Sequence, residues 1–396
     1  MEKMSLKDIN TENKRVLVRV DFNVPLHRET REITDDSRIV AALPTIKYLV
    51  ERNAKIILVS HLGRPKGKVV DELRLTVVAQ RLSQILGQQV GVATDCIGPE
   101  VEKSMEALKN GDVMLLENLR FHSDEETGSS DFARELARLG DVFVNDAFGT
   151  SHRAHASIAG IAQFLPAVAG LLLETEIRIL GGILENPAHP FASVLGGAKV
   201  SDKVGMVENI MGRVDSLLIG GGMAATFLKA KSYGVGRSLV EEDNISSAEA
   251  LMEKALKNGI QLLLPVDVVV ANEMPDKAEV AIVSVEDIPD NKRIVDIGPR
   301  TTNNFCAELK KCRTVFWNGP VGIFEIAQYA KGTRMMAELI ANIKAKTIIG
   351  GGSTAEVIYE LGLADKMTFV STGGGASLKF LSGESLPGIE ALRDKK

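Results

Sequence analysis

The chain has 396 residues, of which 45% are hydrophobic and 25% charged, and its formal net charge is −5. This length exceeds what one hydrophobic core usually supports, so we expect two domains. The net negative charge argues against general nucleic-acid binding.

The cysteines and the apolar stretches indicate a cytoplasmic protein. Cys96, Cys306 and Cys312 are the three cysteines, and they form no C-x-x-C pair. We therefore expect a reduced intracellular protein without a disulfide framework or a thiolate metal site. The longest apolar stretch, residues 164–173, contains Pro166 and is too short to span a bilayer, so we expect no membrane partner.

Short β-branched runs alternate with longer amphipathic stretches along most of the chain. This alternation is typical of α/β domains with parallel sheets. In the first half we expect strands over 15–20, 55–60, 90–93, 113–117 and 142–145, with helices over 38–51, 74–86, 100–109 and 131–139. In the second half we expect strands over 191–195, 216–219, 260–264, 314–317, 347–349 and 367–371.

The segment 165–186 has the features of a joint between two domains. Apolar residues recur at helical spacing from Leu173 to Leu184, after Pro166 and before Pro187. Gly181 and Gly182 loosen this helical pattern near its end. We place the domain boundary near 170–186.

The polar residues at the strand ends differ between the two halves. Strands of the first half lead into arginine, histidine or asparagine, at 19–21, 60–61, 117–120 and 145–146. Strands of the second half lead into glycine, at GGAK (196–199), GGGM (220–223), GGGST (350–354) and GGGAS (373–377). Any single glycine is explained by a tight turn, but four such sites favour a nucleotide. Two anion-holding surfaces predict two charged substrates and a transfer between them.

Two common nucleotide-binding patterns are missing from the sequence. The segment 63–68 has the wrong spacing for a Walker A loop and is followed by Val69 where that loop needs Ser or Thr. No G-x-G-x-x-G fingerprint follows a strand, which argues against a dehydrogenase that uses NAD.

Together, the motifs resemble those of the phosphoglycerate kinase family nearly from end to end. The resemblance is carried by VRVDFNVP (18–25), SHLGRP (60–65), LLENLRF (115–121), NDAFGTSHRAHAS (145–157), GGAKVSDK (196–203), FWNGPVGIFE (316–325) and STGGGASLKFL (371–381). It implies an α/β fold of two Rossmann-like lobes, each a parallel sheet flanked by helices, joined by a hinge helix. The implied segments are a lobe for 3-phosphoglycerate (1–170), the hinge (171–186), a nucleotide lobe (187–378) and a returning tail (379–396).

The resemblance also implies the activity and the residues of the first lobe. The activity is reversible phosphoryl transfer between ATP and the carboxylate of 3-phosphoglycerate, which gives ADP and 1,3-bisphosphoglycerate, with Mg²⁺ bound to the nucleotide. Arg38 would reach the reacting carboxylate and the transferring phosphoryl group; without the resemblance we would read it as a solvent-facing arginine at a helix start. The implied ligands of 3-phosphoglycerate are Asp21, Asn23, Arg38, His61, Arg64, Arg120 and Arg153. His152 and His155 are assigned to loop hydrogen bonds, since no third metal ligand lies at a suitable spacing.

For the nucleotide lobe, the resemblance implies that Lys199 follows the migrating phosphoryl group and that Lys203 binds the nucleotide phosphates. The two lysines lie four residues apart and share a face if a helix starts at the glycines. Glu325 would accept from the ribose hydroxyls, and Gly373, Gly374 and Gly375 would open a helix toward the transferring group. The catalytic set is thus Arg38, Lys199, Gly373 and Gly374; the remaining nucleotide contacts are Gly197, Ala198, Gly221, Gly222, Asn318, Pro320, Gly351, Gly352, Ser353 and Thr354.

The chain departs from the family pattern at three positions. Ser353 stands where the family usually has an aspartate that serves the Mg²⁺–nucleotide complex, so the placement of the metal is unknown. We expect Ser353 and Glu356 to form a capping box at the helix start. Thr175 replaces a usual lysine, and Lys379 replaces a usual glutamate in what we expect to be the first turn of a helix, where its charge opposes the macrodipole. We expect these last two positions to be linked.

An alternative reading is a regulatory or scaffold protein of the same fold whose turnover is weakened by Ser353. Arg38, Lys199, Lys203 and the glycines 373–375 are all present, which favours the enzyme. The resemblance also implies a monomer whose lobes close on their substrates.

Overall fold

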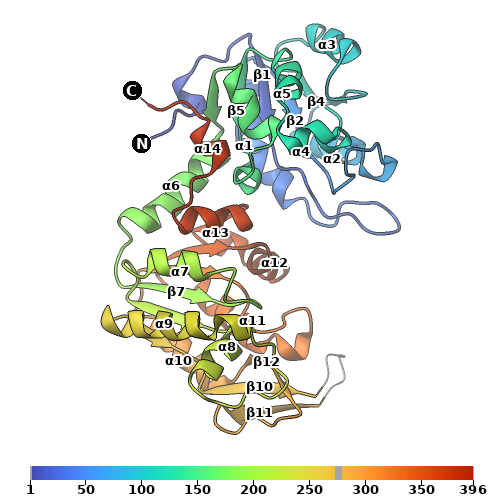
Figure 1. Cartoon of the computed structure of the whole chain (residues 1–396). Helices are drawn as coiled ribbons and strands as arrows, with labels where there is room; N and C mark the ends of the chain where they lie inside the picture. The colour runs from blue at the N-terminus through green and yellow to red at the C-terminus, as the bar shows by residue number, and fades with distance from the viewer. Residues whose placement is uncertain (1, 273–278, 396) are drawn as a thin grey trace. The chain divides into compact units, whose positions relative to one another are not determined.

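The structure is a computed structural model that describes residues 2–272 and 279–395. Residues 1 and 396, at the ends of the expected first lobe and tail, and residues 273–278 of the expected nucleotide lobe lie outside the described residues. Contacts divide the chain into two compact units, Met1–Arg178 with Ser385–Lys396, and Ile179–Glu384 (Figure 1).

The first unit is built on a parallel six-stranded sheet flanked by helices. Its strand order is β3-β4-β2-β1-β5-β6. The strands are β1 (Arg15–Arg19), β2 (Lys55–Val59), β3 (Val90–Val92), β4 (Val113–Leu115), β5 (Val142–Asn145) and β6 (Ala167–Ala169). The helices are α1 (Ser37–Glu51), α2 (Thr76–Leu86), α3 (Pro99–Glu106), α4 (Ser123–Thr127), α5 (Ser130–Ala137) and α14 (Pro387–Glu390).

The central strands of this sheet are apolar because helices cover both of their faces. Val16, Leu17 and Val18 of β1 are fully buried, as are the central residues of β2. The register pairs Arg19, the last residue of β1, with Val59 of β2 and Asn145 of β5. The residues that follow these strands therefore meet at one edge of the sheet.

The second unit repeats the design with another parallel six-stranded sheet, of order β15-β14-β13-β7-β8-β9. The strands are β7 (Phe191–Leu195), β8 (Ser216–Ile219), β9 (Gln261–Leu263), β13 (Thr314–Asn318), β14 (Lys346–Gly350) and β15 (Phe369–Val370). The helices are α7 (Val204–Ile210), α8 (Met223–Ala230), α9 (Ile245–Lys257), α10 (Pro299–Leu309), α11 (Lys331–Ile340), α12 (Gly352–Glu360) and α13 (Gly375–Leu381). Asn318 pairs with Gly350 and Leu195, so the glycine-rich strand ends lie at one edge.

Four strands of the structure are missing from the sequence-based list. One is the short β6; the others form a three-stranded antiparallel sheet of order β11-β10-β12, made of β10 (Asp267–Ala271), β11 (Val280–Ser284) and β12 (Arg293–Ile297). Antiparallel neighbours need no crossover helix, so a search for alternating strands and helices does not find them.

Helix α6 (Leu171–Glu185) contains the point at which the chain passes from the first unit to the second. The helix runs through Gly181 and Gly182 and ends before Pro187. Among the described residues, no helix is long and apolar enough to cross a membrane.

Candidate functional site

In the first unit, a buried arginine and a histidine meet at the carboxyl edge of the sheet. Arg19 is 1% exposed and His61 is 3% exposed. The Nη2 atom of Arg19 lies 3.2 Å from Nδ1 of His61. Because a guanidinium can only donate, Nδ1 must accept, and the proton of the neutral ring then sits on Nε2.

The electrostatic surroundings keep this histidine neutral. Burial lowers the pKa of His61 well below its ordinary value, and the positive charges of Arg19, Arg120, Arg153 and Arg38 lower it further. The ring therefore offers an Nε2–H donor without adding a charge of its own.

A buried carboxylate behind Arg19 balances part of the positive charge. Arg19 Nε donates to Ser157 Oγ (2.9 Å), which in turn donates to Glu125 Oε1 (2.6 Å). Burial raises the pKa of Glu125, but His155, whose Nδ1 lies 3.7 Å from Glu125 Oε1, and the charge of Arg19 outweigh this effect, and the pKa is lowered overall. The His155 ring thus lies beside this buried carboxylate, and its role in loop hydrogen bonding stays a prediction.

More arginines gather around the same edge. Arg120 is 4% exposed, donates to the Gly63 carbonyl over 2.8 Å and pairs with Glu126 at 3.2 Å. Burial lowers the pKa of Arg120; Glu126 opposes this shift, while Arg153 and Arg64 add to it. Like charges held this close favour an anion among them.

The segment after β1 contributes an acid, an amide and a helix-start arginine to this edge. Arg38, near the start of α1, pairs with Asp21, and its side chain is only 35% exposed. Asn23 Oδ1 accepts from the backbone N–H of Gly63 over 2.8 Å. His152 accepts from Arg153 Nε over 3.3 Å, so this histidine also takes part in a loop hydrogen bond.

In the second unit, glycines let three strand-end loops pack against each other. A Cβ atom at Gly196 would lie 2.1 Å from the Pro320 carbonyl, and one at Gly319 would lie 2.3 Å from the Gly196 carbonyl. Gly197 N donates to the Pro320 carbonyl over 2.9 Å. Gly221, at φ +65°, would also clash with this layer if it carried a side chain. Backbone packing therefore explains these glycines by itself.

A lysine and an amide are buried beside these loops. Lys203 is 7% exposed and its Nζ donates to Asn318 Oδ1. Burial lowers the pKa of Lys203 to about 8. The Nδ2 group of Asn318 is buried and has no hydrogen-bond partner among the described residues. A buried donor in this state calls for an acceptor from a ligand.

The prediction that Lys199 and Lys203 lie on one face of a helix is wrong. Helix α7 begins at Val204, and residues 201–203 form a turn before it. This loop is instead held by Glu241, whose carboxylate accepts from the backbone N–H groups of Val200 and Ser201, the latter over 3.0 Å. Burial raises the pKa of Glu241, but the hydrogen bonds from Ser201 and Val200 outweigh this effect and the pKa is lowered overall. The charge of Lys199, which is exposed, adds the smallest contribution to this lowering.

The prediction that Ser353 and Glu356 form a capping box is also wrong. Helix α12 begins at Gly352, and its N-cap is Gly351 at φ +87°, a conformation that favours glycine. Ser353 is exposed within the first turn. Thr354 Oγ1 is buried and accepts from the backbone N–H of Gly319 over 2.6 Å, which ties α12 to the loop after β13.

Helix α13 begins at Gly375, after Gly374 at φ +50°. No described atom lies within 4 Å of a Cβ built at Gly374, so the backbone conformation, not crowding, requires glycine there. Lys379 lies in the last turn of α13 and not in its first, so its charge favours the macrodipole; it pairs with Glu384 at 3.2 Å. Nothing in the structure explains Thr175 in α6, and its link to Lys379 stays a prediction.

The remaining predicted residues lie on the same strand-end loops. Pro320 is buried, whereas Ala198 and Glu325 are exposed, the latter in a turn after β13. A Cβ atom at Gly222 would lie 3.2 Å from Ala198 Cα. A Cβ atom at Gly352 would have no described atom within 4 Å. Gly352 is thus an exposed residue at the start of α12.

Sequence reasoning missed three charged residues that position these sites. Arg19 lies in a quoted motif, and a charged residue ending an apolar strand was a signal for it. Glu125 lies in an acidic run that reads as an ordinary helix start, and Glu241 lies in a loop without a motif, so neither had a usable signal.

Comparisons with known proteins agree on one family. The sequence profile described as phosphoglycerate kinase matches residues 6–384. A phosphoglycerate kinase from Moorella thermoacetica is 53% identical over 395 residues and covers all of both chains. One from Dictyoglomus turgidum is 55% identical over 393 residues and covers 99% of this chain and 98% of the relative.

Solved structures give the same result for the fold. The phosphoglycerate kinase from Coxiella burnetii superimposes with a TM-score of 0.87 at 41% identity, over 98% of both chains. The enzyme from Pyrococcus horikoshii has the same TM-score at 35% identity, with the same coverage.

Proposed function

The chain belongs to the phosphoglycerate kinase family, and on that premise we propose how its residues divide the work of the reaction. The enzyme transfers a phosphoryl group reversibly between ATP and the carboxylate of 3-phosphoglycerate, giving ADP and 1,3-bisphosphoglycerate, a step of glycolysis and gluconeogenesis.

The chemistry of the acceptor explains why cations outnumber bases in both candidate sites. A carboxylate is already ionised at neutral pH, because carboxyl pKa values lie near ~4. The enzyme therefore needs no general base. It must bring two polyanions together, exclude water and stabilise a transition state whose charge is spread over the transferring phosphoryl group.

In this proposal the first unit binds 3-phosphoglycerate. Arg64, Arg120 and Arg153 would hold its phosphate and carboxylate oxygens, and the Nε2–H group of His61 would donate to one of them. The proposal is supported by the mutual electrostatic influence of these arginines and by the low pKa of His61. Asp21 and Asn23 would bind the hydroxyl side of the substrate.

The second unit would bind the nucleotide. One buried pair carries this proposal. Among the described residues, Lys203 Nζ has no carboxylate partner and the buried Nδ2 of Asn318 has no acceptor. Phosphate oxygens satisfy both groups. The loops with Gly197, Gly221 and Gly351 would shape the surface under the phosphates, and Glu325 would accept from the ribose.

We assign the catalytic roles to groups that would contact the phosphoryl group during its transfer. Arg38 would approach from the first unit, and Lys199 with the backbone N–H groups at Gly373 and Gly374 from the second. We propose that residues 171–186 act as the hinge and residues 379–396 as the returning tail during closure. Small-angle scattering tests this proposal: closure predicts a smaller radius of gyration with both ligands bound, and an unchanged radius contradicts it.

Mg²⁺ bound to the nucleotide would neutralise phosphate charge during transfer. The residues near the start of α12 fit a metal held mainly by phosphate oxygens and water, since Ser353 offers only a neutral hydroxyl. This arrangement predicts a high Mg²⁺ requirement. Activity measured against Mg²⁺ concentration should show a lower requirement in Ser353→Asp than in the wild type, and equal requirements would contradict the hypothesis.

A coupled assay with 3-phosphoglycerate, ATP and Mg²⁺ tests the proposed roles. Lys199→Ala and Arg38→Ala should each lower kcat by roughly 10²–10³-fold, the scale seen when a group that stabilises transition-state charge is removed. Arg28→Ala, at an exposed position, is the matched control and should retain wild-type activity. Wild-type kcat in both active-site variants would refute these roles.

The assay also separates the enzyme from the regulatory alternative, which predicts nucleotide binding with little turnover. No observation favours that alternative. We further propose that the enzyme is a monomer, to be tested by light scattering, and that it works in the cytoplasm, to be tested by cell fractionation.

A further inference from the structure

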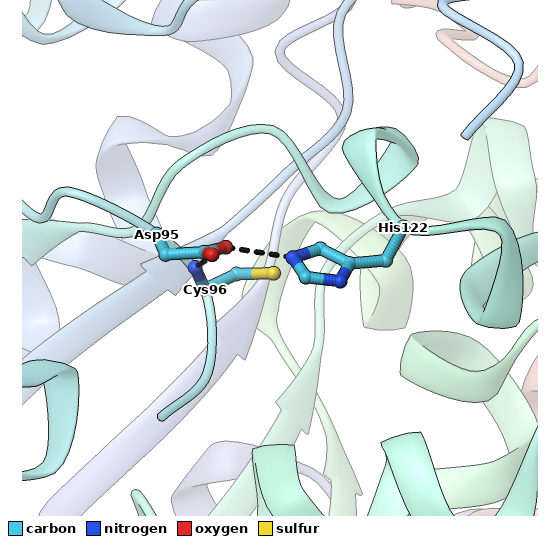
Figure 2. Close-up of side chains that lie close together, drawn as sticks. All are labelled: Asp95, Cys96 and His122. Atoms are coloured by element: carbon cyan, nitrogen blue, oxygen red, sulfur yellow. Dashed lines mark hydrogen bonds and ion pairs between the residues drawn. The ribbon is translucent and has the colours of Figure 1, made fainter. Parts of the chain in front are cut away.

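Three side chains of different ligand types come together in the first unit, apart from the residues assigned above (Figure 2). They are Asp95, Cys96 and His122, and their ligand atoms all lie within 4.8 Å of one another. His122 Nε2 lies 2.7 Å from Asp95 Oδ1. Figure 2 shows the sulfur of Cys96 directed toward the space beside the carboxylate and the imidazole ring.

The fold brings these residues together from two loops at the edge of the sheet. Asp95 and Cys96 follow β3, and His122 follows β4 and the short 3₁₀-helix Leu119–Phe121. The last residues of these strands, Val92 and Leu115, are register partners, so the two loops leave the sheet side by side.

Neighbouring groups fix the orientation of each side chain. Asp95 Oδ1 accepts from the backbone N–H of Cys96 over 2.6 Å. The ring of His122 packs on Phe132 with 5.3 Å between ring centroids. Cys96 is fully buried. Orientation of this kind by surrounding contacts is what metal ligands require.

We propose that Cys96 Sγ, His122 Nε2 and the Asp95 carboxylate form a binding site for a borderline-soft divalent cation such as Zn²⁺. Sulfur, imidazole nitrogen and carboxylate oxygen are the ligand set that Zn²⁺ prefers. Mg²⁺ prefers oxygen ligands alone, so the site discriminates against the ion that accompanies the nucleotide.

The geometry needs only small side-chain movements to accept the ion. Ligand atoms around tetrahedral zinc are separated by roughly 3.5 Å, given Zn–ligand distances of about 2.0–2.3 Å. The distance between Asp95 Oδ1 and His122 Nε2 must increase from 2.7 Å, and Cys96 Sγ must move closer to these two atoms. The Asp95 side chain is 47% exposed, which leaves room for water as a fourth ligand. On binding, the Cys96 thiol releases its proton to solvent, and neutral His122 binds the ion through Nε2 with its proton on Nδ1.

The spacing of the cysteines does not reveal this site, and it led us to expect no thiolate metal site. That rule detects pairs of cysteines, whereas here one cysteine is completed by an adjacent acid and a histidine on another loop. His122 lies two residues after Arg120 of the proposed substrate site in the sequence.

Titration of the untagged, full-length protein with Co²⁺, followed by displacement with Zn²⁺, tests the proposal. The wild type should bind one Co²⁺ with a sulfur-to-cobalt charge-transfer band in the near ultraviolet, and Zn²⁺ should abolish the band. Cys96→Ser should lose the band. His122→Asn and Asp95→Asn should weaken binding by roughly tenfold or more, as expected when a ligand is removed.

Two matched controls come from the other cysteines. Cys306→Ser and Cys312→Ser should keep the band and the wild-type affinity, because neither residue belongs to the cluster. Kinase activity without added Co²⁺ or Zn²⁺ verifies that each variant is folded. The proposal is overturned if the wild type shows no charge-transfer band, if the band survives in Cys96→Ser, or if His122→Asn and Asp95→Asn both bind within twofold of the wild type.

Discussion

The two units use the same sheet architecture but collect positive charge for an anion in different ways. At the edge of the first sheet, Arg19, Arg120 and His61 are buried and influence each other electrostatically. At the edge of the second sheet, glycine turns bring backbones together around one buried lysine, Lys203.

The difference teaches what each kind of ligand demands. Guanidinium groups form forked hydrogen bonds and keep their charge at any physiological pH, which suits a small ligand with a phosphate and a carboxylate. A nucleotide has a long chain of phosphates, and turns with close backbone approach can follow it. The buried lysine adds charge, but at a pKa of about 8 that charge can be lost.

The largest expected effect on ligand affinity comes from removing Lys203, the one buried cation among the described residues of the second unit. Lys203→Met should weaken nucleotide binding by about 10–100-fold, because a hydrogen bond to a charged group contributes about 1.5–3 kcal/mol. Binding of 3-phosphoglycerate should stay unchanged. Isothermal titration of each ligand measures both affinities.

Lys229→Met is the control for this substitution, since Lys229 is an exposed lysine in the last turn of α8. It should bind both ligands as the wild type does. If Lys203→Met weakened 3-phosphoglycerate as much as the nucleotide, the division between the units would be wrong.

A pH titration sharpens the comparison further. The ammonium form of Lys203 binds phosphate, so nucleotide affinity should be complete well below pH 8 and should fall as the pH rises through the lysine's pKa of about 8. The fall is at most about tenfold per pH unit. Affinity for 3-phosphoglycerate should not change over this range, because arginine stays protonated. Equal pH profiles for the two ligands would contradict the assignment.

The smallest expected effect concerns which ring nitrogen of His61 carries the proton. In ¹⁵N NMR spectra of the free enzyme, His61 should show an unprotonated Nδ1 and a protonated Nε2, because Arg19 can only donate to Nδ1. The signals should stay constant from pH ~8 to pH ~6, since the pKa lies well below its usual value near ~6.5. A protonated Nδ1, or titration near pH 6.5, would show that Arg19 does not hold the ring as described.

The sequence predicted the parallel sheets and the polar residues at their edges because both depend on local signals. Buried central strands such as β1 are continuous apolar runs, and the residues after them must reach the same edge. The tertiary partners had no such signal. Arg19 meets Ser157 from a distant segment, and the sequence does not show this pairing.

The errors at helix starts have a related cause. Ser353 and Glu356 have the spacing of a capping box, but Gly351 adopts a positive φ and takes the cap position. The spacing of Lys199 and Lys203 suggests one helical face, but Glu241 binds the backbone of Val200 and Ser201 in the loop before the helix. Local patterns list the possible helix starts, and tertiary contacts select among them.

Hydrogen exchange measured by mass spectrometry, with each ligand added alone, tests the central claim that each unit binds its own anion. We predict that 3-phosphoglycerate protects peptides around residues 19–23, 61–64, 120 and 153, and that the Mg²⁺–nucleotide protects peptides around residues 197–203, 318–320 and 351–354. Protection of the same unit by both ligands would contradict the account.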